Sequence, residues 1–135
     1  MKMRYAAFAA AALVVACTDT ANPGDPTPQV PAAPTAVTSK IQNDSLILTW
    51  NEVPGPTKYN VYMAAEVGVK RANYTSLTAN MFHPDEVGGK FDHPAGLNPN
   101  MKYYLVVTAV NAAGESAESC EVAAELASKF GETCQ

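Results

Sequence analysis

Short segments in which apolar and polar side chains alternate are the feature that most restricts how this chain can fold. Because successive side chains of a β-strand point to opposite faces, such alternation predicts half-buried strands. Residues 45–50 and 59–63 show it, and the Pro-Gly-Pro sequence at residues 54–56 between them predicts a turn. Each segment gathers three apolar side chains on one face, and these are Leu46, Leu48, Trp50, Tyr59, Val61 and Met63.

Two later segments continue this pattern. Residues 103–110 form the longest expected strand, and both of its faces are fairly apolar, which indicates a central strand with a partly covered outer face. Residues 120–126 alternate again and predict a last, half-buried strand. No convincing amphipathic helix separates these segments. We therefore expect an all-β antiparallel β-sandwich.

The first 16 residues have the organisation of an export signal. Lys2 and Arg4 give a positive start, and residues 6–16 form an apolar run of eleven. That run is too short for a membrane-spanning helix, which needs about 20 residues. Its end, Leu-Val-Val-Ala-Cys at residues 13–17, resembles the lipobox of bacterial lipoproteins. The resemblance implies that Cys17 receives a diacylglycerol and further acyl chains and becomes the mature N-terminus.

Ordinary signal cleavage after Ala16 is the alternative, since small residues precede that bond too. The cysteine count favours lipidation, because an odd cysteine in an exported protein needs an explanation. A lipid on Cys17 would leave Cys120 and Cys134 as a pair. We therefore expect a lipid-anchored protein of the bacterial cell envelope. Thr18, rather than Asp, follows the cysteine, and resemblance to enterobacteria-like lipoprotein sorting implies the outer membrane or the cell surface.

The segment after the signal has the composition of a tether. It is rich in Pro, Thr, Asp and Ala and lacks a periodic apolar pattern, so it cannot bury enough surface to order itself. Its prolines favour extended polyproline II. The expected divisions are a signal peptide at residues 1–16, a lipidated N-terminus with linker at residues 17–33, a folded domain at residues 34–126 and a tail at residues 127–135.

Several residues of the folded segment resemble the fibronectin type III pattern in order and spacing. They are Pro34, Trp50, Tyr59 with Val61, Leu97 and Pro99 before Tyr103, and Ala109-Val110-Asn111 before Gly114 and Ser116. The resemblance covers residues 34–126 and implies an immunoglobulin-like sandwich of about seven strands. It also implies that Trp50, Tyr59 and Leu97 define the core. Tyr103 would place its hydroxyl against nearby backbone at a corner of the sandwich.

Cys120 and Cys134 enclose a loop of about 15 residues. In an oxidising compartment we expect them to pair, which would stabilise the fold by about 3 kcal/mol on chain-entropy grounds. The bond would hold the tail against the start of the last strand. Pairing between two chains is the alternative.

Residues 76–95 depart most from the family pattern, and we expect any specificity to lie there. Gly88-Gly89 predicts a hairpin turn that would bring two histidines face to face. The segment holds the only cluster of metal-ligand types, namely His83, Asp85, Asp92 and His93. We expect no metal, because no tight ligand spacing supports one, and these four remain weak candidates.

The formal net charge is −4 without a basic cluster, which argues against nucleic acid as a partner. No serine-hydrolase, zinc-protease, phosphate-loop or dinucleotide motif occurs, so neither an enzyme nor a cofactor is expected. Tyr62, Tyr74 and Tyr104 would either form an exposed binding stripe or pack against neighbouring strands.

We expect a non-enzymatic envelope lipoprotein that presents one domain to an unidentified protein or polysaccharide. The alternative is a structural or accessory subunit of an envelope complex or an extracellular filament. No oligomeric state is indicated.

Overall fold

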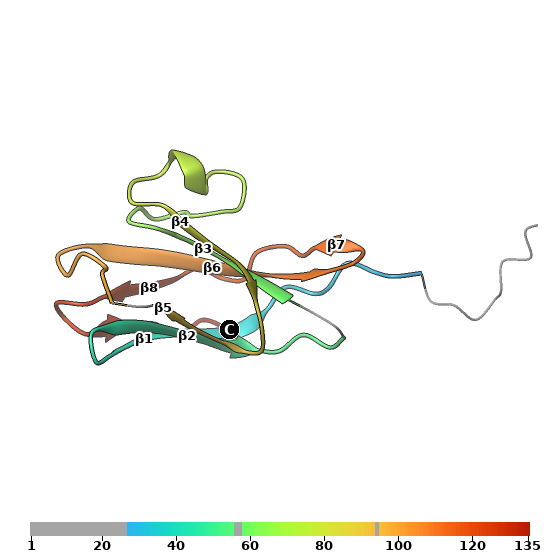
Figure 1. The fold of residues 1–135 in the computed structure, drawn as a ribbon, viewed down its shortest axis with the longest axis horizontal. Helices are drawn as coiled ribbons and strands as arrows, with labels where there is room; N and C mark the ends of the chain where they lie inside the picture. The colour runs from blue at the N-terminus through green and yellow to red at the C-terminus, as the bar shows by residue number, and fades with distance from the viewer. Residues whose placement is uncertain (1–26, 56–57, 94) are drawn as a thin grey trace, which may run out of the picture.

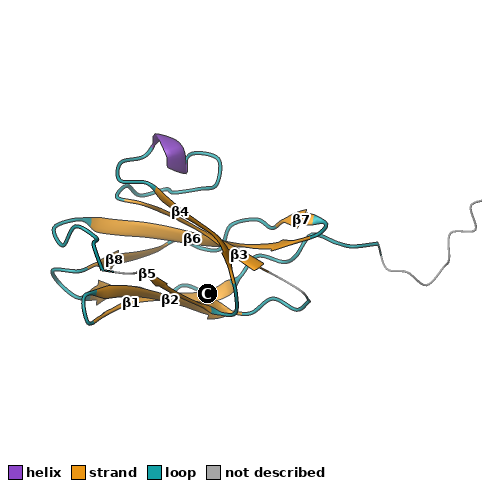
Figure 2. Ribbon diagram, viewed as in Figure 1, coloured by secondary structure: helices purple, strands orange, loops and turns teal. Residues whose placement is uncertain are grey.

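The computed structural model describes residues 27–55, 58–93 and 95–135, which form two antiparallel β-sheets packed face to face (Figure 1). The predicted fold class is confirmed, and the helical content of the described residues is one short 3-10 turn, η1 (Tyr74–Ser76) (Figure 2). The expected signal peptide and Cys17 lie outside the described residues. Within them, no helix has the length and apolar character needed to cross a membrane.

The smaller sheet has the strand order β1-β2-β5, and the larger has the order β4-β3-β6-β8-β9 with β7 paired to β6. The smaller sheet contains β1 (Thr35–Gln42), β2 (Ser45–Asn51) and β5 (Lys90–His93). The larger contains β3 (Lys58–Ala64), β4 (Met81–Glu86), β6 (Lys102–Asn111), β7 (Gly114–Glu115), β8 (Val122–Glu125) and β9 (Phe130–Gly131). The described residues thus hold nine strands where about seven were expected, and β7 and β9 are only two residues long.

The core lies between the sheets and is built from the alternating positions that the sequence indicates. Trp50 of β2 and Tyr59 of β3 meet there with ring centroids 5.1 Å apart. The Tyr59 hydroxyl accepts a hydrogen bond from the Val53 N–H at 2.8 Å, which gives this buried hydroxyl a polar partner. The four positions that the resemblance marks as core all lie in this cluster, and they are Trp50, Tyr59, Leu97 and Tyr103.

Strand β6 is the centre of the larger sheet, where it pairs with β3 on one side and β8 on the other. Its inward side chains, such as Leu105 and Val107, are fully buried. Its outward side chains Val106 and Thr108 are also buried, at 3% and 0% exposed. A strand covered on both faces is therefore confirmed, and its apolar character on both sides follows from that burial.

The corner before β6 has the arrangement that the resemblance implies. The Tyr103 hydroxyl accepts a hydrogen bond from the Asn98 N–H at 3.0 Å. The neighbouring Leu97 is also buried, in the same core cluster as Tyr103. The tyrosine thus supplies a partner to a loop N–H that the sheets do not pair.

The C-terminal tail, residues 127–135, closes the edge of the sandwich between β1 and β8. Its strand β9 pairs with β8 of the larger sheet. Beyond β9, the Cys134 N–H donates to the Val37 carbonyl at 2.9 Å, so the same segment also binds β1 of the smaller sheet. The predicted disulfide between Cys120 and Cys134 is confirmed, with Cα atoms 6.1 Å apart.

The predicted hairpin at Gly88-Gly89 is wrong. β4 pairs with β3 and β5 pairs with β2, so the chain crosses from one sheet to the other at residues 87–89. The crossing runs close to β2, since the Trp50 N–H donates to the Gly89 carbonyl at 3.0 Å. A Cβ on Gly89 would lie 2.6 Å from the Trp50 oxygen, so no larger residue fits this approach.

We expect Tyr103→Phe to lower the free energy of unfolding by about 1–2 kcal/mol, because it leaves the Asn98 N–H without its acceptor. Urea denaturation monitored by Trp50 fluorescence measures this change. Tyr104→Phe is the matched control, since the Tyr104 hydroxyl bonds no other described residue, and it should change the value by less than about 0.5 kcal/mol. Equal effects of the two variants would contradict the assigned role of Tyr103.

Candidate functional site

The outer face of the larger sheet carries a second apolar cluster beneath residues 65–80, which rise above it in Figure 1. The Tyr62 ring lies 5.0 Å from the Tyr74 ring and 4.9 Å from the Phe82 ring, between centroids. Tyr62 is only 3% exposed, and Tyr74 and Tyr104 are half-buried. The expected exposed tyrosine stripe is therefore wrong for Tyr62, and the packing alternative describes this face better.

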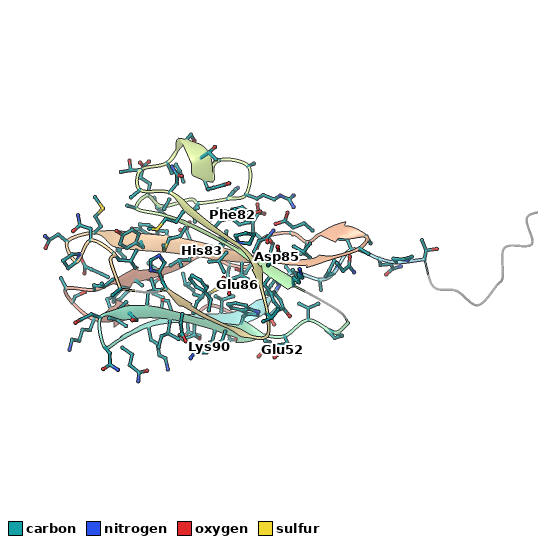
Figure 3. The ribbon with its side chains drawn as sticks, viewed as in Figure 1. Glu52, Phe82, His83, Asp85, Glu86 and Lys90 are labelled. Carbon is teal, nitrogen blue, oxygen red and sulfur yellow. A yellow bond between two sulfur atoms is a disulfide. The ribbon has the colours of Figure 1, made fainter. Side chains whose placement is uncertain are left out.

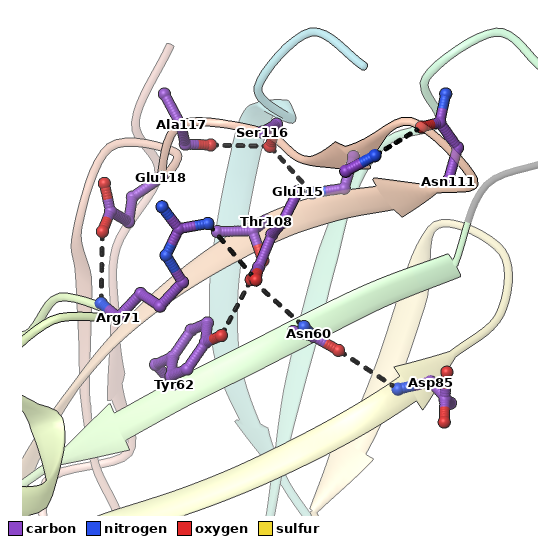
Figure 4. A network of polar contacts seen from close by, with 12 residues as sticks. Asn60, Tyr62, Arg71, Asp85, Thr108, Asn111, Glu115, Ser116, Ala117 and Glu118 are labelled. Carbon is purple, nitrogen blue, oxygen red and sulfur yellow. Dashed lines mark hydrogen bonds and ion pairs between the residues drawn. The ribbon is translucent and has the colours of Figure 1, made fainter. Parts of the chain in front are cut away.

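Glu115, the last residue of β7, connects this face to residues 65–80 (Figure 4). Its carboxylate contacts four side chains, which are Tyr62 Oη at 2.8 Å, Thr108 Oγ1 at 2.5 Å, Asn60 Nδ2 at 3.1 Å and the Arg71 guanidinium at 3.2 Å. Three of these come from β3 and β6 and the fourth from the covering segment. The buried hydroxyl of Thr108 gains its partner here, which such a group requires.

Burial and hydrogen bonding act on the pKa of Glu115 in opposite directions. Burial raises the pKa, but the surrounding donors stabilise the carboxylate and bring the net pKa below its usual value. For Tyr62, burial first and the Glu115 hydrogen bond second raise the phenol pKa. Near neutral pH the pair is therefore a fixed acceptor and donor, which suits a structural role better than proton transfer.

Two further carboxylates bind residues 65–80 to the connection between β7 and β8, residues 116–121. Glu121 Oε2 accepts the backbone N–H groups of residues 68–69, each at 2.8 Å. Glu118 Oε1 accepts the Arg71 N–H at 3.1 Å. A shallow depression of about 320 Å³ remains between the two segments. The cover is thus held by charge-assisted hydrogen bonds to three glutamates spaced three residues apart.

These three glutamates were not predicted as site residues from the sequence. The only signal was their regular spacing in a segment without strand alternation, and that signal does not say what they bind.

His83 and His93 lie along the edge where the chain crosses between the sheets, and Figure 3 shows His83 beside Phe82 there. Their rings are 5.2 Å apart between centroids and meet edge to face. The predicted proximity is confirmed, although the two residues come from different sheets rather than from one hairpin. His93 is 8% exposed, and His83 Nε2 is buried with no hydrogen-bond partner among the described residues.

The two aspartates of the expected cluster lie apart from these histidines. Asp85 pairs with Lys58 at 3.2 Å and Asp92 with Lys90 at 2.8 Å, both on exposed surface. In residues 27–55, 58–93 and 95–135, no three His, Cys, Asp or Glu side chains form a group that could hold a metal ion. The histidine pair alone offers fewer ligands than a stable zinc site uses.

Three turns meet at the end of the sandwich opposite the point where residues 27–34 leave it (Figure 1). They enclose a depression of about 460 Å³. Its nearly buried floor includes Leu97 and Leu126, and Asp44 and Lys129 lie at its rim. Neither charged side chain forms an ion pair or hydrogen bond with another described residue. An apolar floor with unpaired charges of both signs is a surface that can bind a polar ligand.

The third depression, of about 310 Å³, lies over the smaller sheet beside Asn43 and Ile47. None of the three depressions has a histidine or cysteine in its lining.

Comparisons with known proteins agree with this architecture. Residues 32–125 match the family model described as the fibronectin type III domain. A solved Fn3-like protein from Clostridium thermocellum is 26% identical, covers 70% of this chain and 92% of its own, and superposes with a TM-score of 0.56. The FN5 domain of Drosophila Lar is 22% identical, with coverages of 70% and 94% and a TM-score of 0.52. The comparison with curated proteins gave no match.

The histidine pair predicts an acid-sensitive edge. Burial first, and the neighbouring His93 second, hold the pKa of His83 below its usual value, so the unfolded chain takes up a proton before the folded one. This contribution to stability is complete above about pH 6.5 and is lost as the pH falls through the lowered pKa.

We expect the free energy of unfolding to fall between pH 7 and about 5.5, and His83→Gln to flatten that slope. Urea denaturation at each pH measures it, and the interval from pH 8 to 7 serves as the internal control. An unchanged slope in His83→Gln would contradict the account.

The glutamate contacts predict where the cover opens. We expect Glu121→Ala to speed tryptic cleavage after Lys70 and Arg71 by roughly tenfold, since two backbone N–H groups lose a charged acceptor. Glu125→Ala is the matched control, because among the described residues the Glu125 side chain accepts a hydrogen bond only from the Ser128 hydroxyl in the next turn. Mass spectrometry of the first fragments gives both rates, and equal rates would show that Glu121 does not hold the cover.

Proposed function

Because the chain belongs to the fibronectin type III family, we propose that it is a non-catalytic binding module tethered to a bacterial cell envelope. Domains of this family generally act as binding or structural modules rather than as catalysts. In the proposal, Cys17 carries the lipid anchor and residues 17–33 form the stalk. The outer membrane or the cell surface is the proposed location. The ligand is a protein or a polysaccharide.

The observation that carries this proposal is that the tether and the depression lie at opposite ends of the domain's long axis. Residues 27–34 leave beside the β6–β7 turn, where Asn111 Nδ2 donates to the Gln29 carbonyl at 2.7 Å. The β1–β2 turn lies at the opposite end of the sandwich (Figure 1), and its Asp44 lines the depression together with Lys129. A tether fixed at one end of a rigid sandwich leaves the other end free to face a ligand.

The binding surface is tested by photocrosslinking in intact cells. A photoreactive amino acid is introduced at Asp44, and in a control chain at Glu52, an exposed acidic residue in the β2–β3 connection near the tether (Figure 3). We expect a discrete adduct from position 44 and none from position 52. Adducts from both positions, or from position 52 alone, would place the contact elsewhere and contradict the proposal.

The anchor and location are tested separately. We expect Cys17→Ala to move the protein from the membrane fraction to the soluble fraction. Protease added to intact cells should cleave the wild-type domain if it faces outward, and lysed cells provide the control. Resistance until lysis would instead favour an accessory subunit inside the envelope. Unchanged membrane association of Cys17→Ala would remove the lipid from the proposal.

A further inference from the structure

The C-terminal tail is held by contacts that any copy of this chain could supply. Its Glu132 carbonyl accepts the Ser39 N–H at 2.8 Å, and its Glu132 N–H donates to Ser39 Oγ at 2.9 Å. The Glu132 carboxylate also accepts the Ala123 N–H at 2.9 Å. The tail thus fills a slot between β1 and β8 and pairs backbone groups of both strands. Without it, both strands would present unpaired edges.

The fit of the tail into this slot is specific. A Cβ atom on Gly131 would collide with the Ser39 carbonyl oxygen, so only glycine allows β9 to approach β1 this closely. Ser39 is 2% exposed, and its hydroxyl also donates to the Ala123 carbonyl at 2.6 Å. One buried side chain therefore joins β1, β8 and the tail.

The connection to the tail is short and conformationally unfavourable. Residues 126–129 turn the chain from β8 into β9, and Lys129 adopts a φ of 53°, a left-handed conformation that non-glycine residues avoid. If this turn extends, four residues reach roughly 13 Å and carry the tail away from its own domain. The extended connection also releases the strain at Lys129.

We propose that the tail is exchangeable between copies: before the Cys120–Cys134 bond closes, the tail of one chain seats between β1 and β8 of a second copy. The tail makes the same contacts in the exchanged dimer as in the monomer. The two forms therefore differ only in the conformation of the turn at residues 126–129 and in the local concentration of the slot that the tail enters. A dilute monomer keeps its own tail, because the effective concentration of that tail at the slot of its own domain is high. Copies crowded on a membrane, which rests on the proposed lipid anchor, shift this balance toward exchange.

Closing the disulfide then fixes whichever partner is seated. The Cys134 thiol of one chain and the Cys120 thiol of the other lose two hydrogens and form one S–S bond, while an oxidised glutathione takes up the two electrons and two protons as two thiols. The same reaction within one chain gives the closed monomer described above.

Two variants that cannot close their own bond test the exchange. Both carry Cys17→Ser, so that only the tail cysteines remain; one adds Cys120→Ser and the other Cys134→Ser. They are mixed in equal amounts with oxidised and reduced glutathione, and Trp50 fluorescence checks that each is folded. Random pairing of exposed thiols would give three disulfide-linked dimers, with the Cys134–Cys120 heterodimer in the same amount as the two homodimers together. We expect a heterodimer excess of about fivefold or more on non-reducing gels, with the linkage identified by peptide mass spectrometry.

The position of Ser39 supplies a directional control. Ser39→Ala in the Cys134→Ser chain, which receives the tail, should reduce the heterodimer several-fold. The same change in the Cys120→Ser chain, which donates it, should have a much smaller effect. Gly131→Val in the donating chain should abolish the excess. Heterodimer at the random ratio, or an equal effect of Ser39→Ala in either chain, would overturn the exchange and leave the tail as a fixed part of one monomer. Such a result would not affect the proposed binding function.

Discussion

The burial of strand β6 on both faces is the constraint on which the rest of this structure depends. Its inner side chains pack against the smaller sheet, while its outer side chains Val106 and Thr108 also need cover. Residues 65–80 provide that cover, and Glu115 satisfies the Thr108 hydroxyl that lies beneath it. The outer face, which an isolated sheet would offer to ligands, is therefore used for stability. The proposed binding surface is therefore the set of turns at the end of the sandwich.

The sequence predicts the parts of this fold that depend on local pattern. Alternation identifies the inner faces of β2, β3 and β6, because a strand repeats every two residues whatever surrounds it. Tyr103 is identified by its spacing after Leu97 and Pro99, since that spacing defines the corner where its hydroxyl meets the backbone. The cysteine pair is identified by counting, because the first cysteine has another expected use.

The features that the sequence did not predict depend on which strands become neighbours. Gly88-Gly89 indicates a tight connection, but it does not say whether the flanking strands pair with each other or with different sheets. Tyr62 and Tyr104 follow strand alternation, but only the packing of Tyr74 and Phe82 against the Tyr62 ring decides that Tyr62 is covered. The tail lacks a long alternating segment, so its pairing with both sheets follows from the edges it meets rather than from its own composition.

Residue-resolved hydrogen exchange of the folded domain near neutral pH tests this account most directly, because it measures the opening of each segment separately. The account predicts that the amides of β6 exchange slowest, and only through global unfolding. It also predicts that the bonded amides at residues 68–69 exchange well below the rate of an unstructured peptide. Exchange of residues 68–69 at the unstructured rate, with β6 no more protected than the edge strands β4 and β5, would contradict a central strand covered on both faces.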